Sequence, residues 1–355
     1  MIEFQPASLS VPPHFDEWRP AIELVAEATL WAAHFATLLT ASGGGTSSKG
    51  DASPVTAADL ALQAFLVEGL RERGGDLEVV GEESTSVFAG AGGEQLRERV
   101  HQLATVARPG RGASWVDSAI DAGGADGTSS HHWIIDPIDG TRGYLRNQQY
   151  CVCLALVRDG EPVLGLAGCP RLGPRGWLMV AARGAGTHLW DLGNLAAGPR
   201  QARGGTTPRT SLIACESSDA SDRARARLRR IGELLGVSLS ARPMESQCKF
   251  VLVAAGEADL AIRLPSKDPA KNRDMVWDYA GAVVFAEEAG AAMSDCDGRR
   301  LRFGRGRAID GNRGILCSAS WLHDDAVAAC RAADREFEIP LGSLDAGDRS
   351  GSVAG

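Results

Sequence analysis

The stretch Trp133-Ile134-Ile135-Asp136-Pro137-Ile138-Asp139-Gly140-Thr141 changes abruptly from bulky apolar residues to two carboxylates, a glycine and a hydroxyl. Its apolar start is typical of a short buried strand. Pro137 has no N–H for strand pairing, so we predict that the strand ends there. Asp136 is therefore expected at the tip of a strand, and residues 139–141 are expected in the turn that follows.

Two carboxylates three residues apart, Asp136 and Asp139, offer the oxygen ligands that hard divalent cations prefer. Gly140 lets the backbone approach a ligand closely, and N–H groups that open a helix attract phosphate. The stretch therefore predicts a centre that binds metal and phosphate. The same residues also fit an ordinary turn in which each aspartate bonds its own backbone, so the rest of the chain must decide.

The composition bounds the class of protein. A chain of 355 residues with 44% hydrophobic content can bury a large core, and its formal net charge of -8 argues against binding to a nucleic acid polymer. Residues 1–18 lack the pattern of a secretion signal, and the longest apolar run, at 151–157, is too short to span a bilayer. We therefore expect a cytoplasmic protein that acts on a small molecule, and the sequence leaves its oligomeric state open.

The cysteines agree with a reducing compartment. The chain has eight cysteines but no C-x-x-C pair. Cys151 and Cys153 alternate within a strand-like run, which favours small core residues over disulfides or zinc ligands.

Apolar periodicity predicts an α/β (α+β) fold. Residues 24–38 and a segment that starts at Thr56 have helical spacing. Period-two runs at 151–158 and 162–168, joined by Asp159-Gly160, predict a β-hairpin. Further strands are expected at 77–80, 177–182, 186–190, 211–215, 259–264 and 315–317, and further helices at 95–106, 222–235, 246–255 and 278–289. This mixture of strands and helices is typical of a layered architecture.

We expect two subdomains in one compact unit. The first is an α+β unit that carries most metal ligands, and the second is an α/β unit that carries Asp278 and substrate contacts. Their predicted ranges are 1–195 and 196–335, joined by a segment at 192–207 that is poor in bulky apolar residues. Three segments are expected outside this framework: a mobile Gly- and Ser-rich loop at 41–50, an insertion at 85–130 and a disordered tail at 336–355.

Three other acidic positions call for an explanation. Glu82 ends a predicted strand, as Asp136 does, so both side chains are expected in one cleft at the strand ends. Asp278 stands where a predicted helix begins, and Asp59 follows Thr56 by three residues. Each also has a structural explanation: Asp59 fits a capping box, Asp278 fits an acid at a helix N-terminus, and Glu82 fits a solvated loop charge.

Three stretches, in order, resemble the three signatures of one superfamily: Gly81-Glu82-Glu83-Ser84, Asp136-Pro137-Ile138-Asp139-Gly140-Thr141 and Trp277-Asp278-Tyr279-Ala280-Gly281. That superfamily contains the lithium-sensitive, magnesium-dependent phosphomonoesterases: inositol monophosphatase, fructose bisphosphatase and bisphosphate nucleotidase. The resemblance covers residues 22–318 approximately. It implies a layered αβαβα sandwich.

Within this superfamily the chain is most similar to the 3'(2'),5'-bisphosphate nucleotidases. The stretches that carry this similarity are Ser53-Pro54-Val55-Thr56, Gly143-Tyr144-Leu145-Arg146-x-x-Gln149 leading into Cys153-Leu154-Ala155-Leu156, and Glu245-Ser246-Gln247-x-Lys249.

The resemblance also implies roles for individual residues. Glu82, Asp136 and the Ile138 carbonyl would hold a first Mg²⁺, and Asp136, Asp139 and Asp278 would hold a second, with two or three ions in all. Asp59 would polarise the Thr141 hydroxyl, and Thr141 with Glu82 and the first metal would orient the attacking water. Independently of the family, five carboxylates in one cleft repel each other strongly, and bound cations offset that repulsion. Metal-activated water makes a protein nucleophile unnecessary for phosphoryl transfer.

Other phosphatase chemistries fit less well. Cys169 and Arg175 have cysteine-phosphatase spacing, but two prolines between them remove N–H donors that a phosphate loop needs. An aspartyl nucleophile of the haloacid-dehalogenase type needs two aspartates two residues apart, whereas these are three apart. His131 and His132, placed just before the predicted strand, are potential ligands, although exposed loop histidines are commoner.

The substrate side is predicted from a second set of residues. The resemblance and the spacing together assign substrate contacts to Asp139, Gly140, Thr141, Ser246, Lys249, Arg263 and Asp278. Ser246 and Lys249 lie about one helical turn apart and can share a face toward a second phosphate or a nucleoside, and Arg263 can bind the same anion. Alternatively, Lys249 is only solvated and Arg263 pairs with a neighbouring carboxylate.

Two departures from the nucleotidase pattern affect the substrate. After the strand at 211–215, where such enzymes carry a histidine-containing loop, this chain has Glu216-Ser217-Ser218-Asp219. The basic residues expected just before Trp133 are replaced by residues 129–132. Our leading hypothesis is hydrolysis of the 3'-phosphate of 3'-phosphoadenosine 5'-phosphate to AMP. The alternatives are an inositol or other sugar phosphatase and a catalytically silent phosphonucleotide sensor, which the presence of every mechanistic residue disfavours.

Overall fold

The fold is built on a seven-stranded sheet. A computed structural model describes residues 9–41, 46–48, 54–73, 78–268 and 272–340. The strands lie in the order β3-β4-β5-β6-β7-β8-β9, with β3 parallel to β4 and the other pairs antiparallel. Their bounds are β3 (Glu78–Gly81), β4 (His131–Asp139), β5 (Cys151–Arg158), β6 (Glu161–Cys169), β7 (Trp177–Ala182), β8 (Gly186–Asp191) and β9 (Arg200–Ala202).

A second sheet has five strands in the order β11-β10-β12-β16-β14. Their bounds are β10 (Ser211–Glu216), β11 (Ser238–Pro243), β12 (Leu260–Arg263), β14 (Ala291–Ser294) and β16 (Ile315–Ala319). Strands β10, β11 and β12 are parallel, whereas β16 runs antiparallel to both of its neighbours.

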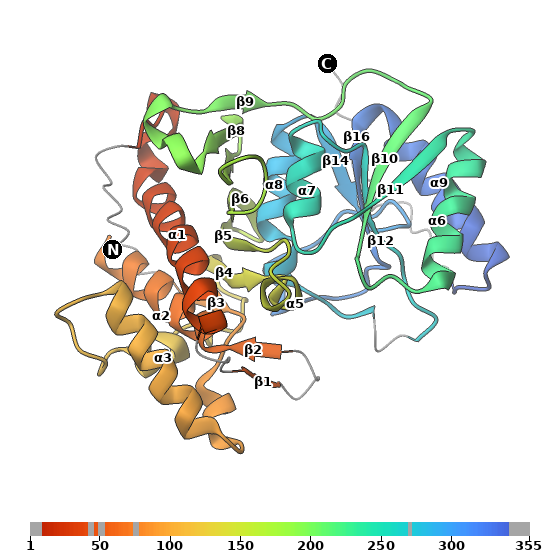
Figure 1. The fold of residues 1–355 in the computed structure, drawn as a ribbon. Coiled ribbons are helices and arrows are strands. Elements are labelled where there is room, and N and C mark those ends of the chain that lie inside the picture. The colour runs from red at the N-terminus through yellow and green to blue at the C-terminus, as the bar shows by residue number, and fades with distance from the viewer. Residues whose placement is uncertain (1–8, 42–45, 49–53, 74–77, 269–271, 341–355) are drawn as a thin grey trace.

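Helices form three layers around the two sheets (Figure 1). The outer helices α1 (Arg19–Ala41) and α2 (Ala57–Glu72) bury apolar residues against one face of the first sheet. Helices α7 (Cys248–Ala254) and α8 (Ala280–Glu288) fill the space between the sheets, and α6 (Asp222–Leu235) and α9 (Ser320–Glu336) cover the far face of the second. The predicted layered αβαβα sandwich is confirmed.

The remaining elements are short or lie at the periphery. The helices are α3 (Gly93–Ala107), α4 (Val116–Asp121) and α5 (Thr141–Leu145). The strand pairs are β1 (Thr46–Ser48) with β2 (Pro54–Thr56) and β13 (Asp274–Met275) with β15 (Ala308–Ile309), and short 3₁₀ segments lie at Pro13–Trp18, Thr85–Ala89, Leu192–Ala197 and Val276–Asp278. Among the described residues, no helix combines the length and apolar character that crossing a bilayer requires.

The predicted hairpin is confirmed. Strands β5 and β6 are joined by Asp159 (φ 52°) and Gly160 (φ 79°). Two successive positive φ angles match the right-handed twist of the strands, which is why Asp-Gly is favoured there. The helices predicted at 246–255 and 278–289 are present but begin two residues later, at Cys248 and Ala280.

The predicted end of the central strand at Pro137 is wrong. Strand β4 continues to Asp139, and its register with β5 shifts between Asp136 and Asp139. A bulge leaves backbone groups outside the ladder, so a proline there costs no strand hydrogen bond. The same bulge carries both aspartates on one continuous segment.

Residues 85–130, predicted as an insertion, complete the outer helical layer. Leu96, Val100 and Leu103 of α3 and Ile120 near the end of α4 are buried in the same core as α2. Within the predicted mobile loop, residues 46–48 form β1, and residues 42–45 and 49–50 lie outside the described residues. Of the predicted tail, residues 341–355 also lie outside them. The division near residue 195 remains our proposal; β9 extends the first sheet slightly beyond it.

Candidate active site

Acidic side chains from three elements meet at one edge of the first sheet. Strands β3 and β4 are parallel, with Gly81 paired to Ile135, so Glu82 and Asp136 follow at the same edge. Asp278 arrives from the single turn that precedes α8. Carboxylate oxygens of Asp136, Asp139 and Asp278 all lie within 4.8 Å of one another. The structure therefore brings together the carboxylates that the sequence predicts for the second metal.

These carboxylates are in an environment that disfavours their charge. Burial raises the pKa of Asp136 well above its ordinary value, and the neighbouring carboxylates, Glu82 first, raise it further. Burial and then Glu82 raise the pKa of Asp278 to about 7. Among the described residues, no hydrogen-bond donor reaches the buried Oδ1 of Asp136. An oxygen-only donor set with an orphaned buried carboxylate oxygen fits hard divalent cations.

Asp59 joins this centre through Thr141. Thr141 Oγ1 lies 3.2 Å from Asp59 Oδ1 and 3.2 Å from the Ile138 carbonyl oxygen, and its single proton can go to either acceptor. The other oxygen of Asp59, Oδ2, accepts hydrogen bonds from the backbone N–H and the hydroxyl of Thr56. The capping box that the sequence offered as an alternative is thus present together with the predicted contact to Thr141.

The turn after Asp139 depends on its glycine. Gly140 has a φ of 90°, and a Cβ there would lie 2.9 Å from the Cβ of Ser246. This close approach lets the backbone N–H of Gln247 donate to Asp139 Oδ2. The Gln247 side chain donates in turn to the carbonyl of Trp277, the residue before Asp278. One segment therefore fixes two of the predicted metal ligands.

Gln63 and Arg307 support the centre, and the sequence analysis missed both. The fully buried Gln63 side chain accepts from the Glu83 N–H and donates to the Glu83 and Ile120 carbonyls. A polar residue on the apolar face of the predicted second helix was the available signal. Arg307 donates to the carbonyls of Gly81 and two further residues, and its guanidinium lies 4.9 Å from the centroid of the Trp277 ring.

Nothing in the sequence distinguished Arg307 from its neighbours, because residues 299–313 contain several arginines. Its two contacts lie one residue before Glu82 and one residue before Asp278. It therefore ties together the backbone segments of two acidic residues that are far apart in the chain.

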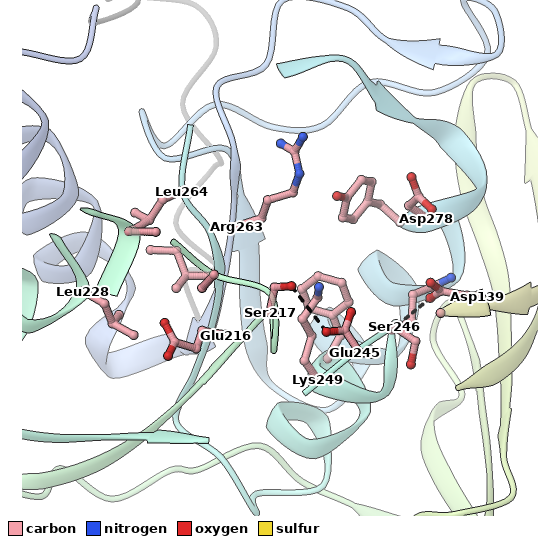
Figure 2. Close-up of a pocket in the computed structure, with 17 residues that line it drawn as sticks. Asp139, Glu216, Ser217, Leu228, Glu245, Ser246, Lys249, Arg263, Leu264 and Asp278 are labelled. Atoms are coloured by element: carbon pink, nitrogen blue, oxygen red, sulfur yellow. Dashed lines mark hydrogen bonds between the residues drawn. The ribbon is translucent and has the colours of Figure 1, made fainter. Parts of the chain in front are cut away.

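A cavity of about 380 Å³ opens beside the carboxylates (Figure 2). It is lined by all of the predicted substrate-binding residues except Thr141, which follows Gly140 of the lining. The apolar part of the lining comes from Leu228, Phe250, Ile262 and Leu264. A cavity of this size, with an apolar wall and a few polar groups, is typical of a small-molecule site.

Two cations line this cavity. The guanidinium of Arg263 pairs with the buried Asp274 at 2.9 Å, and Tyr279 also donates to that carboxylate, at 3.0 Å. Arg263 thus lines the cavity and pairs with a carboxylate, as the alternative interpretation expected, and its contact with a substrate anion stays a prediction. The Lys249 Nζ lies 5.3 Å from the centroid of the Phe250 ring, on the cavity lining, and the lysine lowers the pKa of Asp278.

The segment at 216–219, which departs from the nucleotidase pattern, divides between two environments. Glu216 is buried and lines the cavity, where burial raises its pKa and Arg225, 3.7 Å away, lowers it. Asp219 is exposed and forms ion pairs with Arg146, at 3.0 Å, and Arg142, at 3.7 Å. Asp219 therefore fastens this segment to the region of α5 instead of facing the cavity.

The histidines and the Cys169–Arg175 pair stand apart from the centre. His131 and His132 lie within β4, not before it, and His132 is buried with Nδ1 2.8 Å from the Ser129 carbonyl. No candidate metal cluster among the described residues contains a histidine. Cys169 is buried, and Arg175 is bonded to Asp191, so the structure offers no cysteine-phosphatase loop.

The chain belongs to the inositol monophosphatase family, whose model matches residues 16–335. It is therefore a phosphatase of a family that uses divalent metal ions, which the oxygen donors described above fit. Solved structures share the fold: an inositol monophosphatase of Thermotoga maritima has a TM-score of 0.62 at 17% identity, covering 91% of this chain and 99% of that one. The extragenic suppressor protein suhB of Bartonella henselae has a TM-score of 0.61 at 18% identity, covering 89% and 98%.

Curated relatives point to one branch of the family. A 3'(2'),5'-bisphosphate nucleotidase of Schizosaccharomyces pombe is 31% identical over 319 residues, which covers 84% of this chain and 90% of the relative. The 3'(2'),5'-bisphosphate nucleotidase of Dictyostelium discoideum is 30% identical over 294 residues, covering 79% and 86%. The branch predicted from the sequence motifs is confirmed.

Proposed function

We propose that this protein is a Mg²⁺-dependent phosphomonoesterase that hydrolyses the 3'-phosphate of 3'-phosphoadenosine 5'-phosphate to AMP and phosphate. The observation that carries the proposal is the carboxylate cluster of Asp136, Asp139 and Asp278 beside a cavity with two cations and an apolar wall. The relatives named as bisphosphate nucleotidases support the choice of substrate.

Two groups of oxygen donors would hold the metals. Glu82, Asp136 and the Ile138 carbonyl would hold one Mg²⁺, and Asp136, Asp139 and Asp278 would hold another, with two or three ions in all. Mg²⁺ bound there supplies Lewis-acid stabilisation of the phosphate oxygens and lowers the pKa of water. The orphaned Oδ1 of Asp136 supports its role as the shared ligand.

The residues of the chain position the attacking water. Asp59 Oδ1 accepts the Thr141 hydroxyl proton, which leaves the lone pairs of Thr141 Oγ1 free to accept a proton of the water. Glu82 holds the water from the β3 side. The water oxygen attacks phosphorus as the bond to the ester oxygen breaks, and a proton from the water ends on that leaving oxygen.

The cavity favours a nucleotide over inositol phosphate. Lys249, together with Arg263 that also pairs with Asp274, would contact a second phosphate, which inositol monophosphate lacks. The wall of Leu228, Phe250 and Ile262 offers apolar contact to a flat base, whereas inositol is polar on all sides.

An inositol or other sugar phosphate is the second candidate. Its support is the presence of two carboxylates, Glu216 and Glu245, in the cavity lining, because carboxylates accept hydrogen bonds from sugar hydroxyls. A catalytically silent sensor is disfavoured by the contact between Asp59 and Thr141, which binding alone does not need.

We also propose a cytoplasmic location. All eight cysteines of the chain are free and buried. Free thiols persist in reducing compartments, which supports this location.

Phosphate release from a panel of esters tests the proposed function. With Mg²⁺, 3'-phosphoadenosine 5'-phosphate should have a higher kcat/KM than inositol 1-phosphate or fructose 1,6-bisphosphate. Preference for inositol 1-phosphate would overturn the nucleotide assignment, and turnover of none of them would favour the sensor.

A variant comparison tests the second phosphate contact. Lys249→Ala should lower kcat/KM for 3'-phosphoadenosine 5'-phosphate by roughly tenfold or more, since a charge-assisted contact is worth about 1.5–3 kcal/mol. It should change turnover of 3'-AMP, which lacks the 5'-phosphate, much less. Lys267→Ala, at an exposed lysine paired with Glu338, is the matched control. Equal losses for both nucleotides would contradict the assignment of Lys249.

A further inference from the structure

A cluster of thiols lies directly behind the carboxylate centre. Cys151 and Cys153 come from β5, Cys169 ends β6, and Cys248 begins α7. All four are buried and free, and they belong to the core between the two sheets. In the described part of the chain, Cys151, Cys169 and Cys248 form a group of potential metal ligands made of sulfur alone, and a mixed group of Asp139, Cys151 and Cys153 adjoins it.

The fold itself brings these sulfurs together. Val152 pairs with Gly168 across the antiparallel strands, so Cys151 and Cys169 lie opposite each other at adjacent strand ends. Residues two apart in a strand share a face, which places Cys153 beside Cys151, with 3.4 Å between their Sγ atoms. Helix α7 packs on that face and adds Cys248. The sequence has no C-x-x-C motif that would predict this arrangement, because the cysteines come from three separate elements.

The separations suit a metal ion held by sulfur. The Sγ atoms of Cys151, Cys169 and Cys248 all lie within 4.8 Å of one another. In a trigonal site with metal–sulfur distances of about 2.3 Å, the three sulfurs are about 4 Å apart. Small side-chain shifts would therefore bring these sulfurs into position to bind one metal ion. Thiolates select soft cations, whereas the oxygen-only centre beside them selects hard ones. The two sites therefore discriminate between ions by ligand type.

The thiol cluster also touches the carboxylate centre and its cavity. Cys151 Sγ lies 3.7 Å from Asp139 Oδ2, and Asp139 and Ser246 both line the cavity (Figure 2). Asp139 therefore contacts Cys151 on one side and lines the cavity on the other, and we infer that an ion reaches the sulfurs from this cavity. A thiolate of Cys151 bound to a cation would lose its S–H contact with Asp139 and shift that carboxylate.

We propose that Cys151, Cys169 and Cys248 form a second metal site that takes a thiophilic d¹⁰ cation such as Cu⁺ or Cd²⁺. Metal–sulfur bonds form as S–H bonds break, and the released protons pass to water. Occupation of this site disturbs Asp139 and inhibits phosphate release. Only the inhibition rests on the proposed function; the binding does not.

The test is a titration of the reduced full-length protein with Cd²⁺, in excess Mg²⁺ and a non-thiol reductant. Thiolate-to-cadmium charge transfer gives an ultraviolet absorption that carboxylate binding does not produce. We expect this band to saturate with a single equivalent. Absence of the band in the unaltered protein would overturn the site, whatever the protein hydrolyses.

Variants assign the band to these cysteines. Cys169→Ala and Cys248→Ala each remove a ligand and should weaken Cd²⁺ binding by more than the roughly 10- to 100-fold typical of a lost supporting contact. Cys317→Ala and Cys330→Ala, at buried cysteines of β16 and α9, are matched controls that should keep the band. Thermal unfolding of each variant checks that it is folded. If Cys248→Ala is not folded, Cys248→Ser takes its place. A band that survives both ligand variants, or that disappears in a control, would refute the assignment.

Phosphate release provides the second readout. Cd²⁺ should inhibit the unaltered protein in excess Mg²⁺, and Cys169→Ala should require at least about tenfold more Cd²⁺ for equal inhibition. Equal sensitivity with a lost band would show that inhibition occurs at the carboxylates, and the coupling to Asp139 would be wrong. Lack of any turnover would instead contradict the proposed function and leave the absorption result standing.

Discussion

Replacing Asp136 by asparagine should have opposite effects on phosphate release and on the stability of the metal-free protein. The side chain is buried at the centre of the carboxylate cluster, and the proposal makes it a ligand of both metals. Metal ions supply several kcal/mol of transition-state stabilisation, and about 1.36 kcal/mol corresponds to a factor of ten. Asp136→Asn should therefore lower phosphate release by at least about 1,000-fold while the fold persists, because the amide has the size of the carboxylate.

The same substitution should stabilise the metal-free protein. Burial and neighbouring carboxylates raise the pKa of Asp136 well above its ordinary value, so its ionised form is disfavoured in the folded state. At pH 8 in EDTA, we therefore expect Asp136→Asn to have a higher Tm than the unaltered protein.

Mg²⁺ should reverse the order of stability. A ligand at about 100 times its Kd stabilises the folded state by about 2.7 kcal/mol, and the variant has lost the shared ligand. In thermal unfolding, Asp136→Asn should thus have the higher Tm in EDTA, and the unaltered protein should have the higher Tm in Mg²⁺. Asp325→Asn, at an exposed aspartate on α9, should show neither effect. A variant that is less stable than the unaltered protein in EDTA, or that keeps the full Mg²⁺ shift, would refute the reasoning.

Three further predictions follow from the same centre. First, the pKa of Asp278 is raised from 3.8 to about 7, so its contribution to the stability of the metal-free protein is present below pH 4 and is lost as the pH rises through 7. Unfolding in EDTA should show this loss, up to about 4 kcal/mol, and the Tm shift caused by Mg²⁺ should be larger at pH 8 than at pH 6; equal shifts would contradict it. Second, Gln63→Leu removes the bonds that hold the backbone next to Glu82, so the Mg²⁺ concentration for half-maximal phosphate release should rise by roughly 10- to 100-fold, and an unchanged value would assign Gln63 to stability alone. Third, Arg307→Lys keeps the charge but loses the planar fork over Trp277, so it should raise that Mg²⁺ concentration by about tenfold, whereas the same change at the exposed neighbour Arg305 should not; a similar rise in both would argue against positioning by Arg307.

The meeting of Glu82 and Asp136 could be predicted because it follows from the parallel pairing of two strands. Gly81 pairs with Ile135, so the next residue of each segment lies at the same place, even though β4 continues through a bulge to Asp139. Asp278 differs, because its position depends on how α8 packs between the sheets, and only the resemblance to a family pointed to it. Local pattern therefore explains one half of the carboxylate cluster, and tertiary packing explains the other.

The elements that the sequence analysis missed lack strong local signals. Strand β11 is an edge strand with no fully buried residue, so the alternation that marks a half-buried strand is absent. Helix α9 buries three alanines together with a histidine and an aspartate, so its buried face gives a weak apolar stripe. Arg307 and Gln63 form hydrogen bonds with backbone groups of other segments. Every residue has such backbone groups, so the spacing of residue types in the sequence does not predict these contacts.

Asp59 shows why a structural explanation and a functional one need not compete. Its Oδ2 is fixed by the N–H and the hydroxyl of Thr56, which is the capping box at the start of α2. With that oxygen held, Oδ1 accepts a hydrogen bond from Thr141, which is 82 residues further along the chain. The helix cap is thus the means by which the carboxylate is oriented. A residue that satisfied only the cap would not need to reach Thr141, and a residue that only contacted Thr141 would have no rigid support.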